Sequence, residues 1–73
     1  MTKLPVVSGQ ECVKALQRKG FVVRRQKGSH IIMQRDNPYG LVSIPNHREV
    51  KVGTLRNLIK DAGLTVEEFV ELL

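Results

Sequence analysis

The sequence is poor in the residues that small domains use to reinforce a limited core. It has a single cysteine, Cys12, in 73 residues, so an intramolecular disulfide is excluded. The two histidines form no zinc-type spacing with that cysteine, and we expect neither a metal nor another cofactor. Aromatic residues make up only 4% of the chain. A domain of this size is then expected to gain stability from self-association or from a protein partner.

Long apolar stretches are also missing. No run of apolar residues reaches the length of a membrane-spanning helix, and the apolar stretch near the N-terminus is too short for a secretion signal. The length excludes a large multi-domain enzyme. We therefore expect one domain over residues 1–73, located in the cytoplasm.

Positive charge is abundant and unevenly distributed. Residues 1–56 carry eleven Lys and Arg against three Asp and Glu, a formal charge of +8, whereas residues 57–73 carry one against four, a charge of −3. A polyanion such as RNA is a natural partner for the basic part, because binding releases the counterions of its phosphates. Simple solubility would explain the same composition.

Helix signals occur at both ends of the chain. Ser8 and Glu11 fit a capping box, and the helix that they start is expected to end at Gly20. Residues 52–63 repeat apolar side chains at helical spacing up to a glycine stop. Residues 65–73 predict a short extra helix, whose apolar face packs on the domain's own helices or against a second copy in a homodimer. The residues of that face are Val66, Phe69, Val70 and Leu73.

Between these helices the pattern is that of short strands. We expect strands at residues 21–26, 29–35 and 41–44, with a tight turn after the first and a loop over residues 36–40. In the second strand we place Ile31 and Met33 inward, which sends His30 outward. The fold class is therefore two-layer α+β, with a three-stranded antiparallel sheet and the order α-β-β-β-α over residues 8–63, followed by the additional helix.

Two helices can cover only one face of such a sheet, so the other face stays open. With the inward assignment above, Arg24, Gln26, His30 and Gln34 lie on or near the open face. A polar, basic surface of this kind is typical of nucleic-acid binding.

Three separated motifs resemble the HicA (YcfA-like) family of messenger-RNA interferase toxins. They are Arg25-Gln26-Lys27-Gly28-Ser29-His30, Leu41-Val42-Ser43-Ile44-Pro45-Asn46-His47 and Lys51-Val52-Gly53-Thr54-Leu55-Arg56. The resemblance implies a fold like that of double-stranded-RNA-binding domains, a type II toxin-antitoxin system and neutralisation by a HicB-like antitoxin. It also implies endoribonuclease cleavage of mRNA through the histidine of the G-S-H motif, which is His30 here. The family's motif carries Gly28 and Ser29 beside that histidine.

The chemistry of these residues agrees with that role. RNA supplies its own nucleophile, the 2′-hydroxyl, so an imidazole that moves a proton near neutral pH can cleave it without a metal. Arg24, Arg25 and Lys27 would hold the phosphate and stabilise charge in the transition state. Lys51 begins the second long helix, whose N-terminal amides also suit an anion. The expected RNA-binding residues are therefore Arg24, Arg25, Lys27, Gly28, Ser29 and Lys51, and clustering suggests phosphate contact for Arg35 as well.

Other residues have plainer interpretations, and other functions stay open. For His47 we favour a structural role in the loop before the second long helix over a second acid/base role. Cys12 lies on the apolar helix face, so we take it as a core residue. A catalytically silent RNA-binding module of the same fold is the main alternative function, and a protein-interaction domain is a further one.

Overall fold

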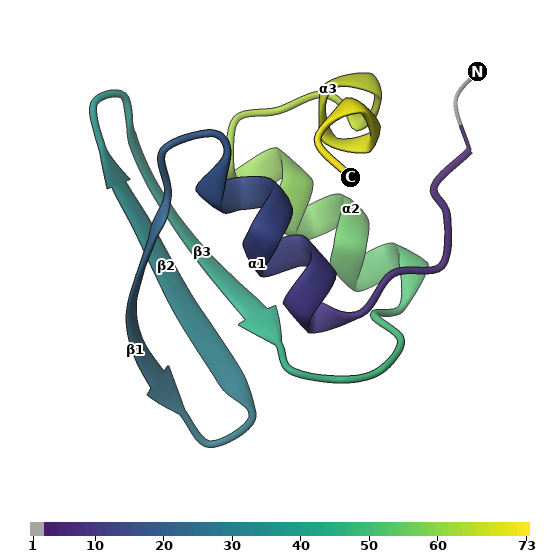
Figure 1. The fold of residues 1–73 in the computed structure, drawn as a ribbon, viewed down its shortest axis with the longest axis horizontal. Coiled ribbons are helices and arrows are strands. Elements are labelled where there is room, and N and C mark those ends of the chain that lie inside the picture. Colours follow the sequence, from purple (N-terminus) through teal and green to yellow (C-terminus); the bar gives the residue numbers. More distant parts are fainter. Residues whose placement is uncertain (1–2) are drawn as a thin grey trace.

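The computed structural model describes residues 3–73 and arranges them as three helices and one sheet (Figure 1). In chain order the elements are α1 (Gly9–Gln17), β1 (Val22–Lys27), β2 (His30–Asp36), β3 (Tyr39–Pro45), α2 (Val52–Asp61) and α3 (Val66–Glu71). This order confirms the predicted α-β-β-β-α arrangement with an additional C-terminal helix. Within residues 3–73, no helix is both long enough and apolar enough to cross a bilayer.

The strands form one antiparallel sheet in the order β1-β2-β3, and only one face of it is buried. Ile31 and Met33 of β2 are 4% and 0% exposed and lie opposite Ile44 and Val42 of β3. Their burial confirms the inward assignment. His30, at the start of β2, is exposed on the outer side as predicted.

The connection between β2 and β3 is shorter than the predicted loop over residues 36–40. Asp36 and Tyr39 lie opposite one another in the ladder, so the turn is formed only by Asn37 and Pro38, which are joined by a cis peptide bond. Turn-forming residue types occur at both ends of this segment and predicted a longer loop. Its backbone instead continues the hairpin ladder up to Asn37 and Pro38. Tyr39 consequently lies on β3, exposed to solvent, and not in a turn.

A register shift between Val23 and Arg25 changes which side chains of β1 face outward. The shift leaves Arg24 without a partner of its own and places Arg25 opposite Ile32, on the outer face. Arg24 lies on the same face, because its Nε donates to Gln34 Oε1 at 3.1 Å. Gln26, which we expected on this face, lies opposite the inward residue Ile31 instead. Strict alternation of side chains, the rule used for the prediction, fails at such a bulge.

The core lies between the inner face of the sheet and the helices. α1 contributes Cys12, Val13, Ala15 and Leu16 to it, as its apolar stripe predicts, and α2 contributes Leu55, Leu58 and Ile59. The predicted capping box of Ser8 and Glu11 is present at the start of α1. Ala62 is the C-cap of α2 and is followed by Gly63 at φ +75°, a left-handed conformation that glycine adopts without steric cost.

Arg35 joins three parts of the fold and is not free for phosphate, contrary to the suggestion from its sequence position. Its guanidinium donates to the carbonyl oxygens of Pro38, Lys19 and Ala62 at 2.9, 3.1 and 3.3 Å. Its Cζ also lies 4.5 Å from the centre of the Phe21 ring. The cation therefore ties the β2–β3 turn to the ends of α1 and α2. These contacts link residues far apart in sequence, which is why the charge pattern alone could not reveal them.

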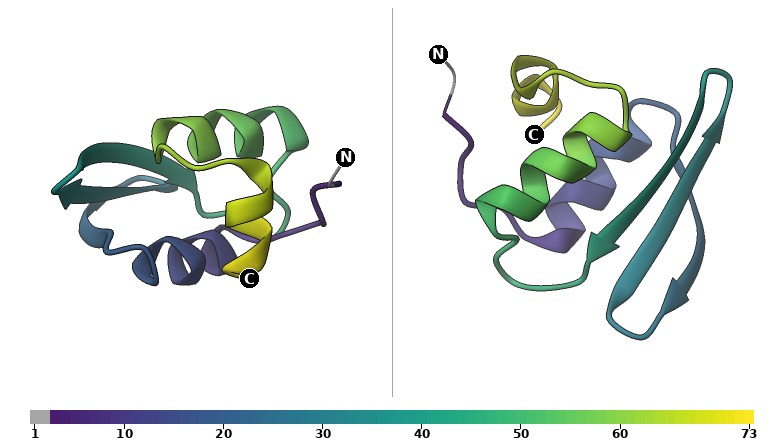
Figure 2. Two further views of the ribbon diagram at one scale, coloured as in Figure 1. Left: turned by 90° about the horizontal axis from the view of Figure 1, so that it is seen from above. Right: turned by 180° about the vertical axis from the view of Figure 1, so that it is seen from behind.

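The extra helix α3 packs on its own domain. Figure 2 shows it running between α1 and α2 on the side away from the sheet. Phe69 is fully buried and Leu72 packs against the core, whereas Leu73, expected on the buried face, is 42% exposed. Thr65 and Glu68 form a second capping box, in which the Thr65 amide and hydroxyl hold the pKa of the Glu68 carboxyl below its usual value.

Gly9 allows the loop before α2 to pass directly over the start of α1. A Cβ at Gly9 would lie 2.9 Å from the Cα of Asn46 and closer still to the carbonyl oxygen of Pro45. Both of these are backbone atoms, which cannot rotate away. The small residue is therefore required by this crossing of two chain segments.

Replacement of Gly9 by Ala is expected to lower the free energy of unfolding by about 1–3 kcal/mol, because the backbone at residues 45–46 must shift. Gly53→Ala is the matched control, since a Cβ there meets nothing within 4 Å and alanine in a helix is favoured by up to about 1 kcal/mol. Urea denaturation of both variants measures the difference. Equal free energies of unfolding for the two variants would contradict the requirement for glycine at this crossing.

Candidate functional site

His30 is positioned by the tight turn between β1 and β2. Gly28 has φ +61° and Ser29 a negative φ, the combination of a type II′ turn, whose first central position favours glycine. This turn brings Lys27 directly opposite His30 in the ladder. On the neighbouring strand, Ser43 Oγ lies 3.4 Å from His30 Nδ1. The imidazole is thus exposed but has a defined polar neighbour on each side.

A pocket of about 260 Å³ opens beside His30. Its walls come from the start of β2, the end of β3, the following loop and the first turn of α2. The lining residues are His30, Pro45, His47, Glu49, Lys51 and Thr54. Both histidines of the chain therefore line one cavity, although seventeen positions separate them in sequence.

The backbone fixes the two histidine-bearing segments to each other. The amide of Asn46 donates to the carbonyl of Ser29 at 2.6 Å, so the residues directly before His47 and His30 are bonded. The carbonyl of His47 accepts from the Gly9 amide at 2.9 Å, and the His47 amide donates to Pro45 at 2.9 Å. The position of the loop is consequently set by α1 and by the β1–β2 turn.

His47, for which we favoured a structural role in the loop over a second acid/base role, thus lies in the lining of the His30 pocket. The only sequence signal for it was its place shortly after a strand and before a helix. That signal cannot show which other turn the loop approaches. Glu49 and Thr54 were likewise absent from the expected site, because neither belongs to the basic cluster around His30.

The pocket also meets the start of α2. Lys51 is the N-cap of this helix, and in the described chain no side chain caps it and no acidic residue occupies its first turn. Its first amides are therefore open to a bound anion, an environment that favours phosphate. Lys51 adds a positive charge at the same place, while Glu49 is the acidic residue of the lining.

The expected RNA-binding residues divide into two groups in space. Lys27, Gly28 and Ser29 flank His30 at the turn, and Lys51 shares its pocket. Arg25 belongs to the same group, because it lies two residues before Lys27 on the outer face of the sheet. Arg24 instead points along the sheet toward Asp36, with 3.7 Å between its Nη2 and Oδ2 of the carboxylate. Asp36 is six residues from His30 on β2, about 20 Å at the usual rise of a strand. Arg24 is therefore held away from the imidazole.

A comparison with protein families agrees with this architecture. The family model described as "HicA toxin of bacterial toxin-antitoxin" matches residues 9–64 of the 73 in this chain. The chain belongs to the HicA toxin family. No curated protein matches it. The HicA family consists of toxins of bacterial toxin-antitoxin systems, so membership implies an antitoxin as partner.

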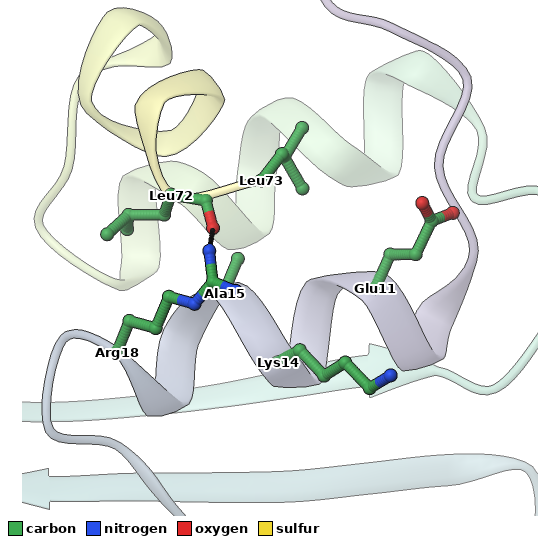
Figure 3. Close-up of a pocket in the computed structure, with 6 residues that line it drawn as sticks. All are labelled: Glu11, Lys14, Ala15, Arg18, Leu72 and Leu73. Atoms are coloured by element: carbon green, nitrogen blue, oxygen red, sulfur yellow. Dashed lines mark hydrogen bonds between the residues drawn. The ribbon is translucent and has the colours of Figure 1, made fainter.

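The match to the HicA family covers α1 to α2 and includes every residue that lines the His30 pocket. A second pocket, of about 220 Å³, lies between α1 and the end of the chain and shares no residue with the first. Figure 3 shows Arg18, the C-cap residue of α1, donating to the Leu72 carbonyl there, at a distance of 2.6 Å. No histidine lines this second pocket, and its arginine joins α1 to the C-terminal segment.

Cys12 lies in the core of this HicA-family chain and does not line the His30 pocket. Cys12 is fully buried, which confirms its assignment to the core, and burial together with Glu11 raises the pKa of its thiol to about 11. Among residues 3–73, no three His, Cys, Asp or Glu side chains lie close enough together to hold a metal ion.

The Cys12 thiol is expected to resist iodoacetamide at pH 8 in the folded protein. A pKa of about 11 leaves roughly one thiol in a thousand as the reactive thiolate, and burial blocks the reagent. Labelling followed by mass spectrometry should become rapid only at urea concentrations that unfold the chain. Labelling of the folded protein at the rate of free cysteine would contradict this expectation.

Proposed function

We propose that this chain is the toxin of a type II system and acts as an endoribonuclease on mRNA, with His30 as a catalytic residue. The proposed reaction uses the 2′-hydroxyl of the substrate as nucleophile and so requires no metal. The observation that carries the proposal is the pocket in which His30 meets Lys51 and the uncapped start of α2. An acid/base group and an anion site thus share one cavity.

The chemistry needed from the protein is limited to proton transfer and charge stabilisation. The 2′-oxygen attacks phosphorus and loses its proton, the bond from phosphorus to the 5′-oxygen breaks, and that oxygen gains a proton. The products are a 2′,3′-cyclic phosphate and a 5′-hydroxyl. Imidazole suits either proton transfer, because its ordinary pKa lies near neutrality.

Phosphate binding is assigned to the cations and amides around the pocket. Lys27 lies opposite His30, Arg25 lies on the same outer face, and Lys51 lines the cavity. Gly28 and Ser29 shape the turn and offer backbone groups beside the imidazole. Arg24 would contact the RNA only farther along the sheet, since Asp36 and Gln34 hold it there.

We further propose that a HicB-like antitoxin neutralises this chain by covering the basic outer face of the sheet. Three cations, Arg24, Arg25 and Lys27, lie on that face, which no helix of the described chain covers. An acidic protein surface would compete there with RNA through the same charges.

His30→Ala is expected to slow the cleavage of a single-stranded RNA by about 10²- to 10⁴-fold, the usual contribution of a positioned acid or base. The side chain is exposed, so the unfolding midpoint should stay close to that of the unchanged protein. Gel assays with end-labelled RNA measure the rate, and phosphatase treatment of the products identifies the cyclic phosphate. Growth arrest on expression should also be lost.

Undiminished cleavage by purified His30→Ala would remove His30 from the reaction. RNA binding without any cleavage by the unchanged protein would favour the alternative function, a non-catalytic RNA-binding module.

Arg25→Ala and Lys27→Ala are each expected to reduce the dependence of RNA binding on salt. Loss of one phosphate contact lowers the slope of log K against log salt by about 0.7 for a single strand. The measurement uses fluorescence anisotropy in the His30→Ala background, where the RNA stays intact. Lys60→Ala, an exposed cation in the last turn of α2, is the charge-matched control. A slope reduced equally by Lys60→Ala would show that net charge alone attracts the RNA.

A further inference from the structure

The proposed cleavage needs two proton transfers at opposite ends of one phosphate. The attacking 2′-oxygen and the departing 5′-oxygen lie on opposite sides of phosphorus in an in-line displacement. One imidazole beside the 2′-oxygen is badly placed to reach the 5′-oxygen at the same moment. A second acid/base group is therefore expected on another wall of the cavity.

Among the side chains that line the pocket with His30, only one other carries an imidazole. The other polar groups of the lining are the carboxyl group of Glu49, the amine of Lys51 and the hydroxyl of Thr54. His47 carries the second imidazole, and imidazole is the side chain best matched to proton transfer near neutral pH.

The backbone holds His47 in a fixed relation to His30. The hydrogen bond from Asn46 to Ser29 joins the residues that precede the two histidines, and His30 lies opposite Pro45 in the ladder. On its other side the loop is bonded to Gly9 and Val7 of the N-terminal segment, at 2.9 and 2.8 Å. A loop tied at both sides suits a group that must be preorganised for catalysis.

The size of the cavity agrees with a reacting phosphate between the two imidazoles. A volume of about 260 Å³ equals that of roughly nine liquid water molecules at about 30 Å³ each. This is room for a phosphodiester and parts of its sugars, with the rest of the RNA outside. Lys51 and the α2 amides would then face the charged oxygens from the side.

We infer that His47 is a second catalytic residue, which forms an acid/base pair with His30 across this cavity. The inference rests on the proposed endoribonuclease function. One imidazole takes the proton of the 2′-hydroxyl, and the other donates a proton to the 5′-oxygen as its bond to phosphorus breaks. Each finishes in the protonation state in which the other began, so reversal of both transfers, with water in place of the leaving alcohol, opens the cyclic phosphate.

The test compares His30→Ala and His47→Ala on two RNA substrates with the same sequence. One has the natural linkage, and the other has sulfur in place of the bridging 5′-oxygen at the cleavage site. A thiolate leaves without being protonated, because thiols are far stronger acids than alcohols. Loss of the general acid therefore matters little for the sulfur substrate, whereas loss of the general base still matters.

Both variants are expected to cleave the natural linkage about 10²- to 10⁴-fold more slowly than the unchanged protein. On the sulfur substrate, the variant that lacks the general acid should recover at least tenfold more of its lost cleavage rate than the other variant does. The histidine replaced in that variant is therefore the general acid. His47→Gln, which keeps a polar side chain but cannot exchange a proton in this range, should behave like His47→Ala. Unfolding midpoints monitor the fold, and Gln10→Ala, which removes a side-chain bond to the same loop, is the control for loop position.

The inference is overturned if His47→Ala and His47→Gln cleave the natural linkage at the unchanged rate. It is also overturned if sulfur substitution alters the losses of the His30 and His47 variants equally, or if Gln10→Ala reproduces the loss of the His47 variants. Absence of cleavage by the unchanged protein would instead refute the proposed function, so the two failures are distinct.

Discussion

Burial of a single face of the sheet is the constraint on which the rest of the structure depends. The helices and the inner side chains of β2 and β3 form the core, and β2 is the central strand. Its register is therefore decided by Ile31 and Met33, which are buried. A slip by one residue would exchange the two faces, burying His30 and exposing both apolar side chains. The apolar residues that stabilise the fold thus also keep the His30 imidazole exposed to solvent, and no other interaction is needed to expose it.

The candidate site forms where several chain segments end together. The β1–β2 turn, the last residue of β3, the loop after it and the start of α2 all meet around the pocket. Hydrogen bonds between backbone groups fix the segments of this junction to one another, as the bond from Asn46 to Ser29 shows. Such a junction leaves side chains free for a ligand while their backbone is fixed. A small domain can therefore combine an ordered backbone with an open cavity.

The arginines show what a charge pattern in the sequence can predict and what it cannot. The sequence predicts a basic region, and Arg24 and Arg25 do lie on the open face of the sheet. The bulge in β1 places both of these neighbours on one face, a result that alternation cannot give. Arg35 belongs to the same cluster in sequence but is partly buried, bonded to three carbonyl oxygens and stacked on Phe21. Charge counts alone do not separate a cation that binds a ligand from one that joins structural elements.

The sequence by itself determined the order of the elements, the inward face of β2 and the exposure of His30. These features follow from the spacing of apolar residues, the helix-capping residues and the turn-forming residues. All three signals depend on interactions between residues close together in the chain. Only the tertiary structure decided that His47, Glu49 and Thr54 share a cavity with His30, and that Arg35 serves the fold. Those relations depend on where distant segments cross, as at Gly9, where the absence of a side chain lets the loop approach α1. Local physics sets each element, but contacts between segments far apart in sequence decide which side chains meet.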